Sequence, residues 1–184
     1  MRLHDSIVVM TQIRIAIFAT LLLSLGAITM FAFDAVPQAG QPAPAVTLPS
    51  QDGSPVSLSE FHGKWVVLYF YPKDNTPGCT IEAHNFQRDL AKYEQANAVI
   101  VGVSVDSTDS HKDFCAKQGL TFKLLADPDK KVVEAYGSLR PNGMALRNTF
   151  LIDPDGKIVK VWTGVSPAQH SEEVLAALND LAKK

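Results

Sequence analysis

The chain has 184 residues, which is enough for one folded domain with its own hydrophobic core. Its 17 basic and 19 acidic side chains give a formal net charge of -2. This balance lacks the basic excess of nucleic-acid-binding domains, so we expect a single domain and no nucleic-acid partner.

An uncharged apolar run extends from Ile15 to Phe33, with Arg14 before it and Asp34 after it. Its length suits either the core of an export signal or a short membrane span. No small-x-small cleavage site stands out, so an uncleaved anchor stays open. We assign residues 1–35 to a signal peptide or membrane anchor. The expected location is the periplasm or the inner membrane, and it would be cytoplasmic only if this N-terminus were not the native one.

Residues 36–44 are rich in proline, glycine, glutamine and alanine, which is the composition of an extended linker. We expect the folded domain to span residues 45–184. Strands and amphipathic helices alternate along it, which predicts a three-layer α/β fold with a mixed central sheet and helices on both faces.

The expected strands are Ala45–Leu48, Pro55–Leu58, Trp65–Tyr71, Ala98–Val105, Phe122–Leu125, Arg147–Ile152 and Lys157–Val161. The expected helices are Cys79–Gln95, Thr108–Gly119, Lys130–Tyr136 and a closing helix that starts from a cap at residues 166–169. The first two strands should form a hairpin, and so should the last two, which flank a strong turn sequence at residues 153–156.

One cysteine lies where an apolar strand changes into a helix. Pro72, Pro77 and Gly78 prevent either element from continuing through this point. Cys79 therefore falls in the first turn of the helix. Unpaired amide groups and the positive end of the helix dipole favour a thiolate there.

A thiolate that reduces peroxide needs donors to hold the peroxide in line. Thr76 lies three residues before Cys79, so its hydroxyl can reach the sulfur or a bound oxygen, while Pro72 shields the sulfur from water. Arg147 opens a core strand, where a thiolate would be a suitable partner. Simpler interpretations exist. The cysteine could be a buried apolar side chain, the threonine a helix cap, the arginine a surface ion pair, and Glu82 a complement to the helix dipole.

Pro72, Thr76 and Cys79 match the active-site signature of peroxiredoxins. Residues 76–83 resemble the subgroup called peroxiredoxin Q or bacterioferritin comigratory protein, and the likeness extends to the segment that begins at Arg147. The resemblance implies a thioredoxin-like fold and reduction of hydrogen peroxide and organic hydroperoxides, with regeneration by thioredoxin or a similar dithiol. It implies Cys79 as the peroxidatic nucleophile, Thr76 and Arg147 as groups that polarise the peroxide, and no metal or organic cofactor.

Many members of this subgroup have their resolving cysteine five residues after the peroxidatic one, where this chain has His84. The remaining candidate is Cys115, on the predicted helix Thr108–Gly119, which resembles another branch of the subgroup. A disulfide needs Cα atoms about 5.5–6 Å apart, so we expect the Cys79 turn and this helix to loosen before the bond forms. Two alternatives stay open for Cys115, a buried apolar side chain and a permanent disulfide with Cys79.

Two other functions are compatible with the same fold. A thiol-disulfide oxidoreductase needs Cys-x-x-Cys, but the first of these positions is Thr76. A non-enzymatic binding module would not need the reactive cysteine at all. No metal site is expected, because the histidines beyond the N-terminal run show no ligand spacing with either cysteine. These are His62, His84, His111 and His170. We expect a monomer that contacts a membrane only through its N-terminal segment.

Overall fold

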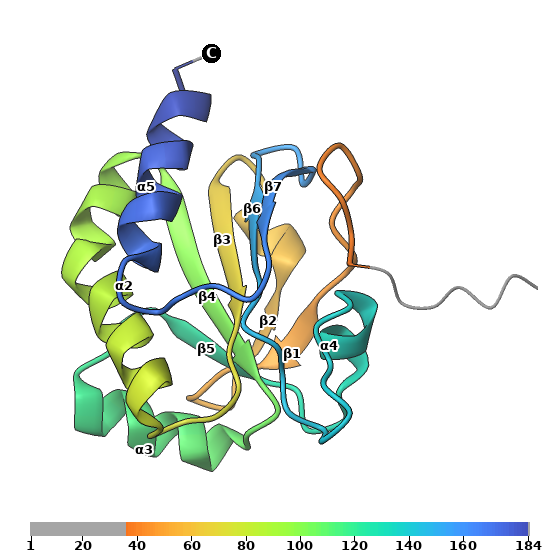
Figure 1. The fold of residues 1–184 in the computed structure, drawn as a ribbon, viewed down its shortest axis with the longest axis vertical. Helices are drawn as coiled ribbons and strands as arrows, with labels where there is room; N and C mark the ends of the chain where they lie inside the picture. The colour runs from red at the N-terminus through yellow and green to blue at the C-terminus, as the bar shows by residue number, and fades with distance from the viewer. Residues whose placement is uncertain (1–35, 184) are drawn as a thin grey trace, which may run out of the picture. The chain divides into compact units, whose positions relative to one another are not determined.

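The computed structural model describes residues 36–183 (Figure 1). The signal peptide or anchor expected in residues 1–35 lies outside this range. Within the range, no helix is both long enough and apolar enough to cross a membrane.

A mixed sheet of five strands forms the centre of the fold, in the order β5-β4-β3-β6-β7. The strands are β3 (Trp65–Phe70), β4 (Ala98–Ser104), β5 (Lys123–Ala126), β6 (Thr149–Ile152) and β7 (Ile158–Trp162). β4 is parallel to both β3 and β5, whereas β6 is antiparallel to both β3 and β7. The mixed sheet and the predicted hairpin of its last two strands are confirmed.

Helices cover both faces of the sheet, as predicted. The elements outside the sheet are the hairpin β1 (Thr47–Pro49) and β2 (Pro55–Ser57), the short 3-10 helix η1 (Leu58–Phe61), α2 (Pro77–Gln95), α3 (Thr108–Gln118), α4 (Lys131–Ala135) and α5 (His170–Leu181). The long helices α2 and α5 pack beside each other against one face (Figure 1). Side chains from α3 join the same hydrophobic cluster, whereas α4, η1 and the β1–β2 hairpin contribute to the cluster on the other face.

The central strand β3 is buried on both sides. Val67 and Tyr69 belong to the cluster beneath α2, while Leu68 and Phe70 belong to the opposite cluster, as the alternation of a strand requires. Gly102 on β4 is the register partner of Tyr69. A Cβ atom at Gly102 would lie 2.7 Å from Cζ of Tyr69, so the tyrosine ring occupies the space that a side chain would need.

The closing helix begins later than predicted. Its first residue is His170, so the cap expected at residues 166–169 is wrong. The carbonyl oxygens of Pro167 and Ala168 accept hydrogen bonds from Nδ2 of Asn85 on α2, at 3.2 and 2.8 Å. Oxygens that would bond within a helix therefore hold the turn against α2 instead.

The segment expected to be a linker, residues 36–44, packs against the domain. The amide of Gly40 donates to the carbonyl of Ile158 at 2.8 Å, and the amide of Ala43 donates to the carbonyl of Gly156 at 2.9 Å. β7 is an edge strand and offers unpaired backbone groups. The folded unit therefore includes this segment, which is not the free linker that its composition suggested.

Candidate active site

Cys79 is the third residue of α2, in the first turn as predicted. Pro77 occupies the first helical position, where its missing N–H has no cost, and Thr76 precedes it with extended backbone angles. The amides of Gly78 and Cys79 donate to no other described residue. They remain free to bind an oxygen at the positive end of the helix, beside a sulfur whose side chain is 2% exposed.

Arg147 lies two positions before β6, which starts at Thr149 and not at Arg147 as predicted. Because β6 runs antiparallel to β3, the segment before β6 meets the segment after β3 at one edge of the sheet. Nη2 of Arg147 donates to Sγ of Cys79 at 3.4 Å. Burial lowers the pKa of Arg147, but the charges of Glu82 and Cys79 outweigh it and raise the pKa above its ordinary value. The guanidinium stays positive next to the sulfur.

Glu82 belongs to this site, which sequence reasoning missed. We expected it to complement the helix dipole, but it lies beyond the first turn and is 1% exposed. Its Oε2 accepts a hydrogen bond from Nη1 of Arg147, while its Oε1 has no partner among the described residues. Burial raises the pKa of Glu82 to about 7, more than Arg147 lowers it. The available signal was its position three residues after Cys79, on the same helix face.

Thr76 and Pro72 lie in the loop between β3 and α2, and both are half-buried. Thr76 is the N-cap residue of α2, but its hydroxyl makes no capping hydrogen bond. It donates instead to the carbonyl of Lys73 at 2.9 Å. Among the described residues no hydrogen bond joins Thr76 to Cys79. With its proton used, the hydroxyl oxygen can still accept a hydrogen bond from a ligand.

Cys115 lies on α3 and is 8% exposed, in the same hydrophobic cluster as Cys79. Both cysteines are free thiols, so the structure does not contain the permanent disulfide considered above. Burial, followed by the charge of Asp74, raises the pKa of Cys115 to about 11. At neutral pH this side chain is a buried, protonated thiol, which cannot attack a partner until the surrounding structure opens.

The histidines take separate positions. His62 and His84 are exposed, whereas His111 and His170 are fully buried. Nε2 of His170 lies 2.7 Å from Oγ1 of Thr149. Within residues 36–183, histidine, cysteine and carboxylate side chains do not gather in threes that could hold a metal ion.

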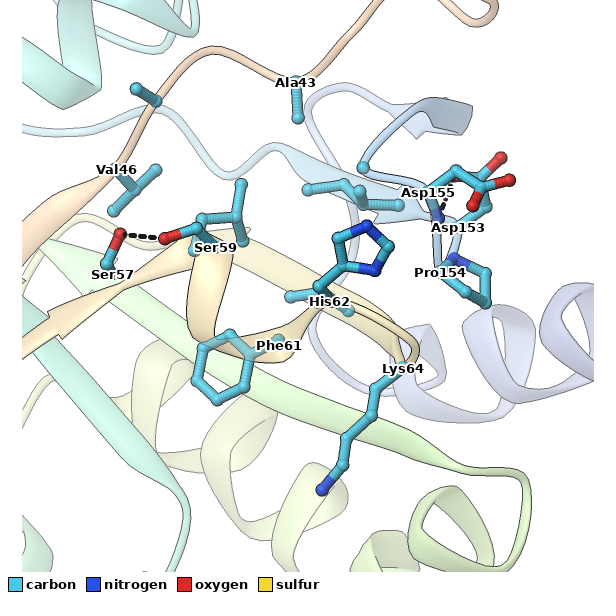
Figure 2. Close-up of a pocket in the computed structure, with 15 residues that line it drawn as sticks. Ala43, Val46, Ser57, Ser59, Phe61, His62, Lys64, Asp153, Pro154 and Asp155 are labelled. Atoms are coloured by element: carbon cyan, nitrogen blue, oxygen red, sulfur yellow. Dashed lines mark hydrogen bonds between the residues drawn. The ribbon is translucent and has the colours of Figure 1, made fainter.

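A cavity of about 310 Å³ lies at the other end of the sheet (Figure 2). Its lining includes Lys64 and Val66 at the start of β3, His62 just before them, and Asp153 just after β6. Cys79 follows the opposite end of β3. The cavity is therefore separate from the cysteine site.

A buried cysteine at a helix N-terminus, in contact with a guanidinium, is the arrangement that a thiol peroxidase requires. The comparisons agree, because residues 39–161 match the model of the AhpC/TSA family. The chain is 42% identical to peroxiredoxin Bcp of Bacillus subtilis over 153 residues, which cover 79% of this chain and 97% of the relative. It is also 42% identical to peroxiredoxin Bcp of Xanthomonas campestris over 139 residues, or 72% and 87% of the two chains. A solved structure of the bacterioferritin comigratory protein of Xanthomonas campestris superposes with a TM-score of 0.75 and 38% identity, covering 79% of this chain and 99% of that one.

The chain belongs to the AhpC/TSA family, in its peroxiredoxin Bcp or peroxiredoxin Q subgroup, and is a thiol peroxidase. The thioredoxin-like fold that the resemblance implied is confirmed. The family membership decides against the thiol-disulfide oxidoreductase and the non-enzymatic binding module.

Proposed function

We propose that Cys79 is the peroxidatic nucleophile of this peroxiredoxin and that it reduces hydrogen peroxide and alkyl hydroperoxides. The observation that carries the proposal is the 3.4 Å contact between Sγ of Cys79 and Nη2 of Arg147, in the first turn of α2. A positive guanidinium and free amides at a helix N-terminus both stabilise a thiolate. The substrate class is supported by the alkyl peroxide reduction activity named for the Xanthomonas campestris protein.

The same groups suit the chemistry of the first step. Oγ1 of Thr76 can accept a hydrogen bond from the O–H of the hydroperoxide, which aligns the attacked oxygen with the sulfur. The thiolate attacks this oxygen, the S–O bond forms as the O–O bond breaks, and an alkoxide or hydroxide leaves. Arg147 and the amides of Gly78 and Cys79 can donate to the developing charge, and water supplies the proton that completes the alcohol or water product. Pro72 limits the access of bulk water to the sulfur.

We propose that Cys115 is the resolving cysteine. Its thiol attacks the sulfenic acid on Cys79, an S–S bond forms and water is released. Serine variants of two cysteines have been solved for Xanthomonas campestris peroxiredoxin Q, and these are separated by the same number of positions as Cys79 and Cys115. Because Cys115 is buried in the reduced protein, α3 and the Cys79 turn must loosen locally. A dithiol protein such as thioredoxin then reduces the disulfide.

The test uses two serine variants and one oxidant. With a dithiol reductant, Cys79→Ser should lose peroxide consumption completely. Cys115→Ser is the matched control. Without a reductant its Cys79 should still consume about one equivalent of peroxide, but it should form no intramolecular disulfide. After one equivalent of peroxide, mass spectrometry of the unmodified sequence should find an intramolecular Cys79–Cys115 bridge. Peroxide consumption by Cys79→Ser would exclude the nucleophile, and absence of the bridge would exclude the resolving role.

We also propose that the protein is exported and acts as a monomer. The apolar run from Ile15 to Phe33 after Arg14 supports export, so the reductant would be a dithiol outside the cytoplasm. Cell fractionation with N-terminal sequencing of the mature protein tests this location, and full-length chain in the cytosol would contradict it. Size-exclusion chromatography with light scattering tests the monomer in the reduced and oxidised forms.

A further inference from the structure

A buried polar pair joins the active-site loop to the helix that carries Cys115. Asp74 lies in the loop after β3, five residues before Cys79, and is 5% exposed. His111 lies on α3, four residues before Cys115, and is fully buried. Oδ2 of Asp74 and Nδ1 of His111 are 2.8 Å apart. Each cysteine is therefore close along the chain to one member of the same pair.

Three more residues complete the cluster around Asp74. The hydroxyl of Tyr71 donates to Oδ1 of Asp74 at 2.7 Å, and the hydroxyl of Ser110 donates to Oδ2 at 2.7 Å. The amide of Asp74 donates to Oδ2 of Asp106, just after β4, at 2.9 Å. These bonds fix the loop both to α3 and to the segment that leads into α3.

The Asp74–His111 contact is charge-assisted because the acceptor, Asp74, is a carboxylate. Nε2 of His111 lies 3.1 Å from the carbonyl oxygen of Leu125, so both ring nitrogens face acceptors. Burial raises the pKa of Asp74, but the hydrogen bond and charge of His111 outweigh it and lower the pKa, which favours the carboxylate. Removing either partner leaves the other buried without this hydrogen bond.

We propose that Asp74 and His111 are positioning residues that control the resolving step. The inference rests on the proposed function, because it requires Cys115 to capture the sulfenic acid. While the pair is intact, the loop and α3 keep the arrangement in which Cys79 meets peroxide and Cys115 is buried. The pair separates before the disulfide can form.

The consequence is a competition between two fates of the sulfenic acid. Capture by Cys115 gives the disulfide and water. Reaction with a second hydroperoxide gives the sulfinic acid and one molecule of alcohol or water, and inactivates the enzyme. The longer the Asp74–His111 pair holds, the more of the enzyme follows the second route.

The experiment follows both products in the full chain, by rapid quench with hydrogen peroxide and mass spectrometry. Asp74→Asn should form the disulfide about tenfold faster than the unmodified sequence, the change expected when a charge-assisted hydrogen bond is lost. Ser110→Ala removes one hydrogen bond to Asp74 and leaves the contact with His111, so it should accelerate the reaction by about threefold. In both variants a smaller fraction becomes sulfinic acid at excess peroxide. If Asp74→Asn does not fold, the rate of disulfide formation in Ser110→Ala tests the proposal.

Asp127→Asn is the matched control. Asp127 is 1% exposed, and its Oδ2 accepts from the amides of Val132 and Val133 at the start of α4, so its carboxylate makes no hydrogen bond to Asp74 or to α3. Like Asp74→Asn, the variant Asp127→Asn loses a buried carboxylate. It therefore measures how much general destabilisation alone changes the rate. Its rate of disulfide formation should equal that of the unmodified sequence.

A second control repeats Asp74→Asn in a Cys115→Ser background. Sulfinic acid formation should then be the same with and without Asp74→Asn, because no resolving step remains to be accelerated. The inference is overturned if Asp127→Asn accelerates disulfide formation as much as Asp74→Asn does. It is also overturned if neither Asp74→Asn nor Ser110→Ala changes the rate of disulfide formation. A third contrary result would be that Asp74→Asn alters sulfinic acid formation in the Cys115→Ser background. An unmodified chain that forms no Cys79–Cys115 bridge overturns the proposed resolving cysteine as well, and so separates the two failures.

Discussion

A Cβ atom at Gly78 would lie 3.3 Å from Nη2 of Arg147, so the absence of a side chain at Gly78 makes room for the guanidinium beside Cys79. This distance is tighter than most Cβ contacts, and Cγ of Pro167 lies close on the same side. Gly78 is a helical residue, so the reason for glycine here is space and not backbone freedom. The position of Arg147 therefore depends on a residue that carries no functional group.

Gly78→Ala should slow the reaction of Cys79 with hydrogen peroxide by about tenfold, because a small displacement of a charge-stabilising group is costly in rate. Stability should not fall, because alanine is a better helix former than glycine. Stopped-flow kinetics measure the rate, and thermal unfolding provides the control. An unchanged rate would mean that Arg147 accommodates the methyl group without leaving the sulfur.

Glu82→Gln tests the buried carboxylate through stability at different pH values. The pKa of Glu82 rises from 4.5 to about 7 on folding, so folding favours its protonated form. Its stabilising contribution is complete below pH 4.5 and is lost as the pH rises through 7. The free energy of unfolding of the unmodified protein, minus that of Glu82→Gln, should therefore decrease by up to about 3 kcal/mol over this range.

Urea unfolding at a series of pH values measures the difference. The control is Glu172→Gln, at a carboxylate that is 65% exposed and pairs with Arg88 on the surface. A difference for Glu82→Gln that does not change with pH, or that increases, would contradict the assignment of Glu82.

Tyr69→Phe should leave the free energy of unfolding unchanged or raise it by up to about 1 kcal/mol. The hydroxyl of Tyr69 is buried and has no hydrogen-bond partner among the described residues. Burial, then the charges of Glu82 and the two cysteines, raise the pKa of Tyr69 well above its ordinary value. Removing this unsatisfied buried hydroxyl therefore breaks no hydrogen bond.

The comparison variant is Tyr93→Phe, because the hydroxyl of Tyr93 donates to the carbonyl of Ser171 at 2.6 Å. The free energy of unfolding of Tyr93→Phe should be about 1–2 kcal/mol lower than that of the unmodified protein in the same urea titration. Equal losses for the two variants would show that Tyr69 has a partner of its own.

Cys115 should react slowly with alkylating reagents in the folded, reduced protein. Burial raises the pKa of this thiol from 9.0 to about 11, which alone lowers the thiolate fraction about hundredfold near neutral pH. In a Cys79→Ser background, iodoacetamide labelling followed by mass spectrometry isolates this side chain. Addition of urea should restore the rate of an ordinary cysteine. Rapid labelling in the native protein would mean that Cys115 is accessible without local opening.

The sequence was sufficient wherever the determinants were local. Pro77 and Gly78 place Cys79 at the start of a helix, and the turn at residues 153–156 joins the last two strands, as predicted. Arg147 was identified because a charge at a core strand needs a partner. These inferences depend on neighbours along the chain or on one unusual residue.

The remaining features depend on packing between distant segments. Glu82 is buried only because the segment before β6 brings Arg147 against it. Asp74 lies in the loop after β3 and His111 lies on α3, so the two residues come together only in the folded structure. Their spacing in the sequence matches no known motif. The start of the last helix was missed because Asn85 on α2 binds the carbonyls that would otherwise extend the helix. Such contacts appear only when the topology is known.

The antiparallel pairing of β3 with β6 also affects when the protein becomes reactive during its synthesis. Cys79 leaves the ribosome well before Arg147, and the guanidinium reaches the sulfur only after β6 has docked beside β3. A nascent chain that ends before this strand holds a cysteine without its cationic neighbour. With Cys79 as the proposed peroxidatic residue, we therefore expect oxidant sensitivity to emerge late in biogenesis, once most of the polypeptide has been made.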